Sequence, residues 1–284
     1  RIIVRTVVDS TARLISRPTA MVACAILMCA ALCATLSPWL APHDPSDQDL
    51  AHRLSPPLSR DDYPLGTDHL GRDILSRTIY GSRISLLVAC TSVLLAGVLG
   101  TIAGIVAGYS GGWIDQIVGW ASDVQLAIPF ILLTIAVVAV IGKGLWNLVL
   151  VLGVTGWVRY ARVVRGQALA LREGEFVEAA RAVGAGHCRI LVRYIFPNLS
   201  PTLVVLTTFD VGRLIVLEAA ASFLGLGVDP ATPSWGTMLA DGRAYLATAW
   251  WVTTVPGLAV TLTVLGINLL GDWLREVLDP YSQQ

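Results

Sequence analysis

Ionisable residues are sparse in this 284-residue chain, and the stretch 173–197 gathers an unusual number of them. Together with Arg172 at its edge, it carries Glu173, Glu175, Glu178, Arg181, Arg189 and Arg193. Because charged side chains are costly inside a bilayer, we expect this stretch to lie in water or against another protein. Its carboxylates and guanidinium groups could form charge-assisted hydrogen bonds with a partner. The stretch is therefore a candidate docking surface.

A second group of ionisable residues, Asp210, Arg213 and Glu218, lies within the apolar run 199–224. A charge at that depth must face the interior of a helix bundle or a wet cavity. Asp210 and Arg213 are three residues apart and can pair on one helix face. One hypothesis is neutralisation inside the bundle, which we slightly prefer. The other is that these side chains line a transport pathway.

Other kinds of chemistry find little support. The phosphate-binding pattern GxxxxGK[ST] is absent around Lys143, so we do not expect this chain to hydrolyse ATP. The five cysteines are not at metal-ligand spacing, and a loop with His43, Asp44, Asp47, Asp49 and His52 is usually just solvated, so no metal site is predicted. Zero net charge without a basic stripe argues against a nucleic-acid partner.

The elements that must position these residues are transmembrane helices. With 55% apolar and 14% charged residues, the chain has too little polar surface for a soluble globule. We predict an all-α, polytopic membrane protein with six transmembrane helices. The expected spans are 19–40, 84–107, 118–141, 145–164, 199–224 and 250–270. The first is interpreted as a retained helix, because it is long for a signal peptide and lacks a clear cleavage site.

Three divisions follow from this pattern. Residues 1–41 form a cytoplasmic N-terminus and the first helix. Residues 42–83 form an external loop that closes with an interfacial amphipathic helix, for which Thr67 and Asp68 are the expected N-cap. Residues 84–284 form a five-helix core that includes the elbow 173–197. The arginines favour the side that holds the N-terminus, which places both termini in the cytoplasm.

Local signals add detail to the core. Gly100, Gly104 and Gly108 at four-residue spacing predict close helix packing, and Pro129, placed near the start of its span, should bend it. Helix formers over 175–182, glycines at 184 and 186, and a second short helix over 188–195 before Pro197 predict a helix-turn-helix elbow.

The elbow also resembles a known motif. Glu178-Ala179-Ala180, then Gly184 and a terminal Phe196-Pro197, is similar to the EAA motif of membrane subunits of binding-protein-dependent ABC importers. The segments 64–73, 108–112, 222–227, 233–236 and 268–272 resemble the C-type permease of dipeptide, oligopeptide and nickel importers. The resemblance covers about residues 40–280. In one departure, Tyr194-Ile195-Phe196-Pro197 replaces the usual Ile-x-Leu-Pro ending.

The resemblance implies a type I ABC importer permease in a bacterial or archaeal plasma membrane. Its partners would be a homologous second permease, two ATPase subunits or one fused ATPase, an external substrate-binding protein and membrane lipid. ATP and Mg would belong to the ATPases, and this chain would hold no cofactor. The expected ATPase-coupling residues are Glu175, Phe176, Glu178, Ala179, Ala180, Arg181 and Gly184, with Phe176 and the Ala179-Ala180 face buried in an ATPase groove.

Peptides are the expected cargo, and Asp210, Arg213 and Glu218 are then candidates to meet their charged ends. Nickel or another small cargo is the alternative, because the external binding protein does much of the selection in such importers. A secondary transporter is a weaker hypothesis, since no convincing inverted repeat is present.

Overall fold

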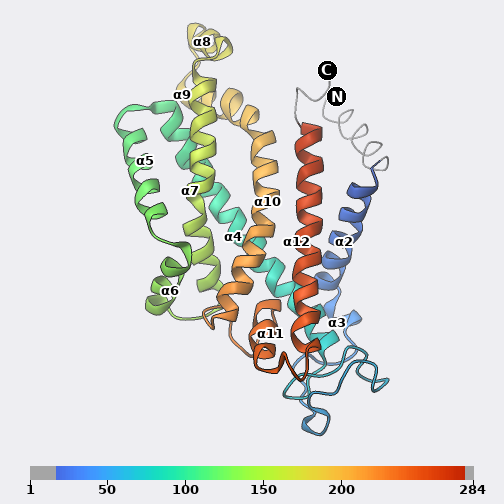
Figure 1. Ribbon diagram of the computed structural model, residues 1–284. Helices are drawn as coiled ribbons and strands as arrows, with labels where there is room; N and C mark the ends of the chain where they lie inside the picture. The colour runs from blue at the N-terminus through green and yellow to red at the C-terminus, as the bar shows by residue number, and fades with distance from the viewer. Residues whose placement is uncertain (1–16, 279–284) are drawn as a thin grey trace.

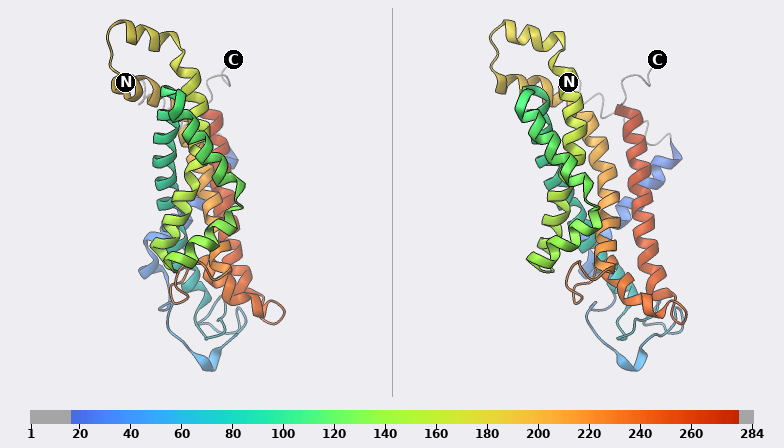
Figure 2. Two further views of the ribbon diagram at one scale, coloured as in Figure 1. Left: turned by 90° about the vertical axis from the view of Figure 1, so that its left-hand side faces the viewer. Right: turned by 60° about the vertical axis from the view of Figure 1, so that its left-hand side comes forward.

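The computed structural model describes residues 17–278, and within that range the chain is helical and contains no β-strand. The long helices run side by side as a bundle (Figures 1 and 2). They are α2 (Pro18–Thr35), α4 (Ile74–Ser110), α5 (Gly112–Ala127), α6 (Phe130–Ile141), α7 (Leu145–Arg172), α10 (Phe196–Phe223) and α12 (Trp251–Leu278). The shorter elements are α3 (Ser37–Leu40), η1 (Leu50–His52), α8 (Glu175–Ala182), α9 (His187–Ile190), the π-helical turn η2 (Leu191–Ile195), α11 (Trp235–Gly242) and η3 (Arg243–Tyr245).

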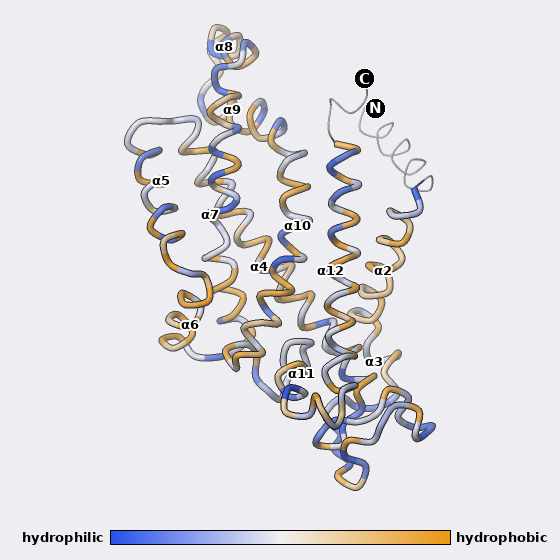
Figure 3. The backbone as a smooth tube through the Cα atoms, viewed as in Figure 1, coloured by the Kyte–Doolittle hydropathy of each residue, from blue (hydrophilic) through white to orange (hydrophobic). Residues whose placement is uncertain are grey.

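The long helices can supply the six membrane spans that the sequence predicts. By length and hydropathy, α2, α4, α7 and α12 can each cross a membrane, and α5 with α6 can act as one bent span. The remaining long helix, α10, matches α12 in length and lies within the bundle, but it carries three charged residues (Figure 1). Hydrophilic residues concentrate around α8 at one end and in the loops at the other (Figure 3). The expected all-α, six-helix class is confirmed.

The predicted bend at Pro129 is present and large. Helices α5 and α6 meet at 91°, with Ile128 and Pro129 between them. Proline lacks the backbone N–H that would continue the helix, and its ring clashes with the preceding turn. The break falls in the middle of the span, however, and not near its start. Two shorter helices therefore replace the single kinked helix that we expected.

The start of α4 also differs from the prediction. The helix is capped by Asp73, whose carboxylate accepts hydrogen bonds from the backbone N–H groups of Leu75 and Ser76. No separate interfacial helix begins at Thr67 or Asp68, so that expectation was wrong. The segment before Asp73 is a loop, and α4 then continues unbroken for 37 residues. At about 1.5 Å per residue, it is much longer than a bilayer core is thick, so one end must project beyond the lipid.

Helices α4 and α7 approach closely where the sequence predicted it. A Cβ atom on Gly100 would lie 2.2 Å from the carbonyl oxygen of Trp157, and one on Gly104 would lie 2.6 Å from that of Ala161. At Gly108 the corresponding distance, to the oxygen of Arg165, would be 2.7 Å. Real Cβ atoms do not tolerate such contacts. The three glycines therefore set the separation of these two helices, as small residues do in membrane bundles.

At the end of the bundle opposite α8, the loop 41–73 packs with α11 and the start of α12 (Figure 1). We call this part the loop end. Its apolar cluster consists of Ile74, Met238, Ala249, Trp251 and Val252, all buried. The indole Nε1 of Trp251 donates a hydrogen bond to the carbonyl oxygen of Thr67 (3.1 Å). The loop end is therefore a compact unit with its own core.

A buried ion-pair network completes the loop end. Asp68 pairs with Arg72 (2.7 Å) and with Arg77, while Asp241 lies 3.1 Å from Arg72 and 3.3 Å from Arg77. Burial by itself raises the pKa of Asp68, but the two guanidinium groups and two backbone N–H groups outweigh it, so this pKa lies below its usual value. His69 lies near both carboxylates, but the arginines already neutralise them, so this is an ion-pair network and not an evident metal site.

Candidate functional site: an exposed elbow and a buried charge cluster

The expected elbow is present and stands clear of the bundle. Helix α7 continues to Arg172, and α8, α9 and η2 then lead directly into α10. Both views in Figure 2 show this segment projecting at the end away from the loop end. Helix α8 has the predicted limits, Glu175–Ala182. The second limb consists of α9 and the π-helical turn η2 in place of one short helix, and Pro197 lies in the first turn of α10, where it was expected to open the span.

Gly184 makes the sharp turn after α8. Its φ angle is +80°, a conformation that glycine adopts without strain. The N–H of Ala185 donates to the carbonyl oxygen of Ala180 (3.0 Å), and the N–H of Gly184 donates to that of Arg181 (2.9 Å). This is the Schellman pattern of helix termination, which satisfies the last carbonyl groups of α8. The turn is thus fixed by the backbone itself.

One face of α8 is buried against the rest of this chain. Val177 and Ala180 pack into an apolar cluster with Val164, Ile190 and Leu199, from three other helices. Ala180 is only 4% exposed, so it is not available to a partner and was wrongly expected to face an ATPase groove. Its small side chain instead allows α8 to lie close to the core. The cluster holds the elbow in a fixed orientation.

The side of α8 next to this buried face is exposed. Phe176, Ala179 and Val183 follow one another at intervals of three and four residues and form an apolar stripe. Val183 is 83% exposed, an unusual state for a large apolar side chain. We did not predict Val183, although its spacing from Phe176 was a usable signal.

Charged residues flank this stripe. Glu175, Glu178 and Arg181 are all exposed, as is Gly184 at the turn. Glu175 and Glu178 occupy the first turn of α8, where the helix dipole favours negative charge. All the expected coupling residues except Ala180 thus reach the surface of the elbow. We call Phe176, Ala179 and Val183, with these charged neighbours, the elbow surface.

The end of α4 supports the elbow through Tyr109, which the sequence did not single out. The hydroxyl oxygen of Tyr109 lies 2.8 Å from Nδ1 of His187, at the start of α9. The guanidinium carbon of Arg181 lies 5.7 Å from the centre of the Tyr109 ring, in cation–π geometry. One side chain of α4 therefore contacts both limbs of the elbow.

The structure brings Asp210 and Arg213 together as expected. Nε of Arg213 lies 2.6 Å from Oδ1 of Asp210, and Nη1 of Arg159 from α7 lies 3.2 Å from the same oxygen. Asp210 is fully buried, whereas the side chains of Arg213 and Arg159 are 35% and 44% exposed. The carboxylate is thus neutralised within the bundle, and the two arginines present the accessible charge. The sequence did not predict the role of Arg159.

Glu218 has a separate environment. It is fully buried and accepts hydrogen bonds from the hydroxyl groups of Ser85 (2.9 Å), Ser222 (2.9 Å) and Ser234 (3.1 Å). The backbone N–H of Trp235 in turn donates to the hydroxyl oxygen of Ser85 (3.2 Å). These bonds connect α4, α10 and the start of α11. Glu218 therefore joins three elements inside the protein and does not face an open pathway here.

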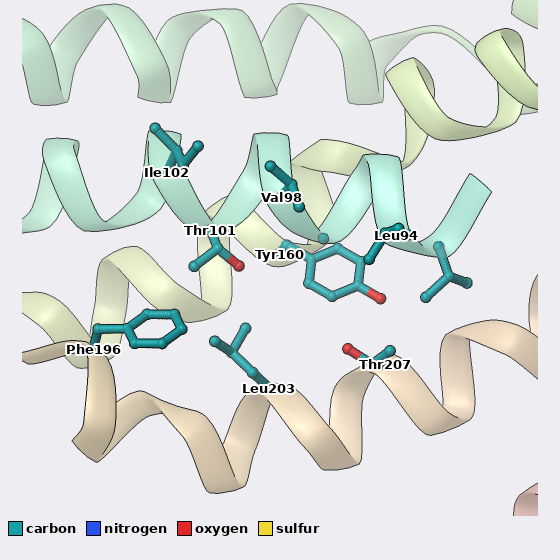
Figure 4. Close-up of a pocket in the computed structure, with 10 residues that line it drawn as sticks. Leu94, Val98, Thr101, Ile102, Tyr160, Phe196, Leu203 and Thr207 are labelled. Atoms are coloured by element: carbon teal, nitrogen blue, oxygen red, sulfur yellow. The ribbon is translucent and has the colours of Figure 1, made fainter. Parts of the chain in front are cut away.

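A pocket of about 330 Å³ lies between α4, α7 and α10 (Figure 4). Its walls are mainly apolar, and its polar groups include the hydroxyls of Tyr160 and Thr207. Asp210 lies one turn further along α10 than Thr207. Such a lining suits an apolar group better than an ion. The residues labelled in Figure 4 are Leu94, Val98, Thr101, Ile102, Tyr160, Phe196, Leu203 and Thr207.

Comparison with known proteins identifies the family that shares this architecture. Residues 100–282 match the model for the binding-protein-dependent transport system inner membrane component, and residues 8–57 match the N-terminal TM domain of oligopeptide transport permease C. The chain is 42% identical to the di/tripeptide transport system permease protein DppC of Pseudomonas aeruginosa (strain UCBPP-PA14), over 87% of this chain and 83% of that protein. It is 41% identical to the nickel transport system permease protein NikC of Escherichia coli (strain K12), over 94% and 95%.

A solved structure of the MetNI methionine ABC transporter in inward-facing conformations has a similar fold. The TM-score is 0.58 at 21% identity, and the match covers 72% of this chain and 96% of the other. At that identity the likeness concerns the fold alone. The sequence matches are decisive, because one family model spans more than half of the chain and the relatives cover most of it. This chain belongs to the family of binding-protein-dependent transport system inner membrane components, as a multi-pass membrane permease.

Proposed function

We propose that this chain is a permease subunit of an ATP-driven importer that takes up peptides delivered by an external substrate-binding protein. It would form the pathway with a homologous second permease and couple to two ATPase subunits, or to one fused ATPase, through the elbow surface. ATP and Mg would be bound by the ATPases. The relatives named as peptide or dipeptide permeases support the cargo class. We place both termini in the cytoplasm of a bacterium or archaeon, on the same side as the elbow.

The observation that carries the proposal is the exposed apolar stripe of α8. Phe176 lies on a short helix and Val183 directly follows it, and Val177 and Ala180 anchor this helix to the core. An amphipathic helix that shows apolar side chains to solvent is the usual form of a helix that docks in a groove of a partner. Exposed charges beside the stripe, such as Glu178 and Arg181, can add charge-assisted hydrogen bonds.

The elbow must also transmit movement. A nucleotide-driven change in the ATPases can switch the pathway only if the two states differ in their contacts with this chain. Because the cluster behind α8 includes residues of α7 and α10, a push on the elbow reaches both helices directly. We propose that this path moves the bent pair α5 and α6 and exposes the pathway alternately to the two sides.

Within the pathway, we propose that Arg159 and Arg213 supply the accessible positive charge, while Asp210 and Glu218 hold the helices in place. This assignment follows the exposure of the two arginines and the complete burial of the two carboxylates. A partly exposed guanidinium group can pair with the terminal carboxylate of a peptide. Replacement of Arg213 by Gln should then alter peptide preference, whereas an unchanged preference and rate would remove this role.

The docking proposal is tested by copurification from membranes. Val183→Asp, or Glu178→Arg with Gly184→Asp, should release the ATPases while the two permeases stay together. Arg275→Glu, an exposed change on α12 at the same end of the bundle, is the matched control and should retain them. Full retention of the ATPases and of transport in the elbow variants would refute the docking role.

The cargo is tested separately. Mass spectrometry and metal analysis of the external binding protein that copurifies with this permease should show bound peptide. Bound nickel without peptide would favour the second candidate, which the 41% identity to a nickel permease supports. Either result leaves the coupling role of the elbow unaffected.

A further inference from the structure

The loop end carries a small closed loop, residues 54–68, that stands out from the molecule. The N–H of Leu54 donates to the carbonyl oxygen of Asp68 (2.9 Å), and the N–H of Thr67 donates to that of Ser55 (3.1 Å). These bonds close the base of the loop. Trp251 braces it from behind through its hydrogen bond to Thr67. The loop is therefore held as a fixed structure and is not a slack connection.

Leu58 lies within this loop, opposite Pro64, and its side chain is in solvent. Its side chain is 87% exposed, the highest value among the large apolar residues of the described chain. Its N–H donates to the carbonyl oxygen of Pro64 (3.2 Å), and the hydroxyl of Ser59 donates to that of Pro56 (2.6 Å). The backbone around Leu58 is thus fixed by hydrogen bonds on both sides.

The backbone of Leu58 is also unusual. Leu58 and Leu54 have φ angles of +60° and +54°, and within residues 17–278 they are the non-glycine residues with positive φ. For a bulky side chain this conformation is strained, and strain of this kind persists only where the surrounding structure holds it, often at functional sites. Packing accounts for the positive φ angle of Leu54, since its side chain contacts the apolar cluster of the loop end. Leu58 has no comparable packing among residues 17–278.

The surroundings of Leu58 argue against contact with lipid. Arg60, Asp61 and Asp62 follow it in the loop, and all three are exposed. Charged side chains at a lipid-facing tip would have to leave water at high cost. The loop also lies beyond the ends of the helices, as both views in Figure 2 show. The exposed charges and the position of the loop therefore favour an aqueous environment for Leu58.

We propose that Leu58 and its charged neighbours are a contact surface for the external substrate-binding protein. This inference rests on the proposed function. An apolar anchor surrounded by a polar and charged rim is the usual anatomy of a protein–protein contact. The loop lies at the end of the bundle away from the elbow, which excludes the ATPases, and it extends past the ends of the helices (Figures 1 and 2).

The loop is also connected to the transport core. Leu54, at its base, is hydrogen-bonded to Asp68, and the carboxylate of Asp68 pairs with Arg77 in the first turns of α4. Helix α4 then runs the whole length of the bundle to Tyr109 beside the elbow. A protein that engages Leu58 therefore contacts a rigid unit that continues to the opposite end of the molecule.

The test uses the complete transporter in lipid nanodiscs and the purified binding protein that copurifies with the wild type. Leu58→Asn keeps the size and tolerates positive φ, so it removes mainly the apolar contact. We expect it to weaken binding by about tenfold, the effect of losing one hot-spot side chain. Leu58→Met should bind nearly as the wild type does. Leu50→Asn, an exposed change in the same loop region, is the matched control and should have no effect.

Each outcome decides the proposal. Equal affinity of the wild type and Leu58→Asn overturns the contact at Leu58 but leaves the importer role intact. Loss of the second permease from the Leu58→Asn complex overturns it as well, because the loop would then serve assembly. If no binding protein associates with the wild type and no ATPase copurifies, the proposed function itself fails. A melting temperature of Leu58→Asn equal to that of the wild type shows that the weakened binding is not a folding defect.

Discussion

Tyr109 and His187 are joined by a 2.8 Å contact between the phenol oxygen and Nδ1, which fixes the end of α4 to the start of α9. Helix α4 begins at Ile74 inside the loop end, so a single unbroken helix contacts structures at both ends of the bundle. A continuous helix is stiff along its axis and can transmit displacement over its whole length. The following predictions examine this arrangement and the contacts that hold it.

Tyr109→Phe removes the hydroxyl and retains the ring beneath Arg181. The lost hydrogen bond is expected to cost about 1 kcal/mol, so transport-coupled ATP hydrolysis should fall several-fold while the ATPases remain bound. The rate is measured in proteoliposomes that contain the whole transporter. His187→Ala should produce a similar loss, and the double variant should be no worse than either single one. Additive losses would show that the two residues act independently.

Gly184→Ala introduces a side chain at φ +80°, where it meets no atom within 4 Å. The effect is therefore backbone strain alone, and we expect the elbow to be destabilised by about 1 kcal/mol. Hydrogen exchange of the α8 amides should become faster. Gly184→Asn is the control, because asparagine tolerates this conformation better and should cause a smaller change. Identical exchange in all three proteins would contradict the importance of the turn.

Gly104→Val should disrupt the bundle itself. Its Cβ would lie 2.6 Å from the carbonyl oxygen of Ala161, so α4 and α7 must separate. Overpacking of a tight core usually costs about 1–3 kcal/mol, and here the contact is with backbone that cannot move aside. The yield of folded protein and its melting temperature in detergent report the loss. Gly119→Val, at a position with no atom within 4 Å, should behave like the wild type.

The loop end should lose stability at acidic pH. The pKa of Asp68 in the folded protein lies below its unfolded value of about 3.9. This carboxylate therefore contributes its full stability above pH ~4. The contribution is lost as the pH falls through the folded-state pKa. Thermal unfolding followed from pH 6 downward should show the decline below about pH 4.

Asp68→Asn provides the comparison for this pH dependence. At neutral pH it removes one of the two carboxylate partners of Arg77, which is 2% exposed, and leaves only Asp241 at 3.3 Å, so we expect a loss of about 3 kcal/mol. The same variant should respond less to acid than the wild type, since the titrating group is gone. An unchanged acid response would assign the effect to other carboxylates.

The sequence by itself determined the class of protein and the position of its elbow. Long apolar runs can be satisfied only by helices in a membrane, so the helical class followed from composition. The limits of α8, the turn at Gly184 and a bend at Pro129 followed from local backbone preferences, which depend on a few neighbouring residues. The pairing of Asp210 with Arg213 also followed, because the two residues are one helical turn apart.

Only the tertiary structure decided which side chains face a partner and which face the core. Ala179 and Ala180 are adjacent in sequence, yet the first is exposed and the second is buried by residues of α7, α9 and α10. Arg159 pairs with Asp210 although the two residues are 51 positions apart in the sequence. Tyr109 contacts His187 across a sequence separation of 78 positions. Asp68 and Arg77 were assigned to an exposed loop and an interfacial helix, but folding against Asp241 buries them both. Contacts of this kind depend on how whole helices pack, which no local pattern of residues specifies.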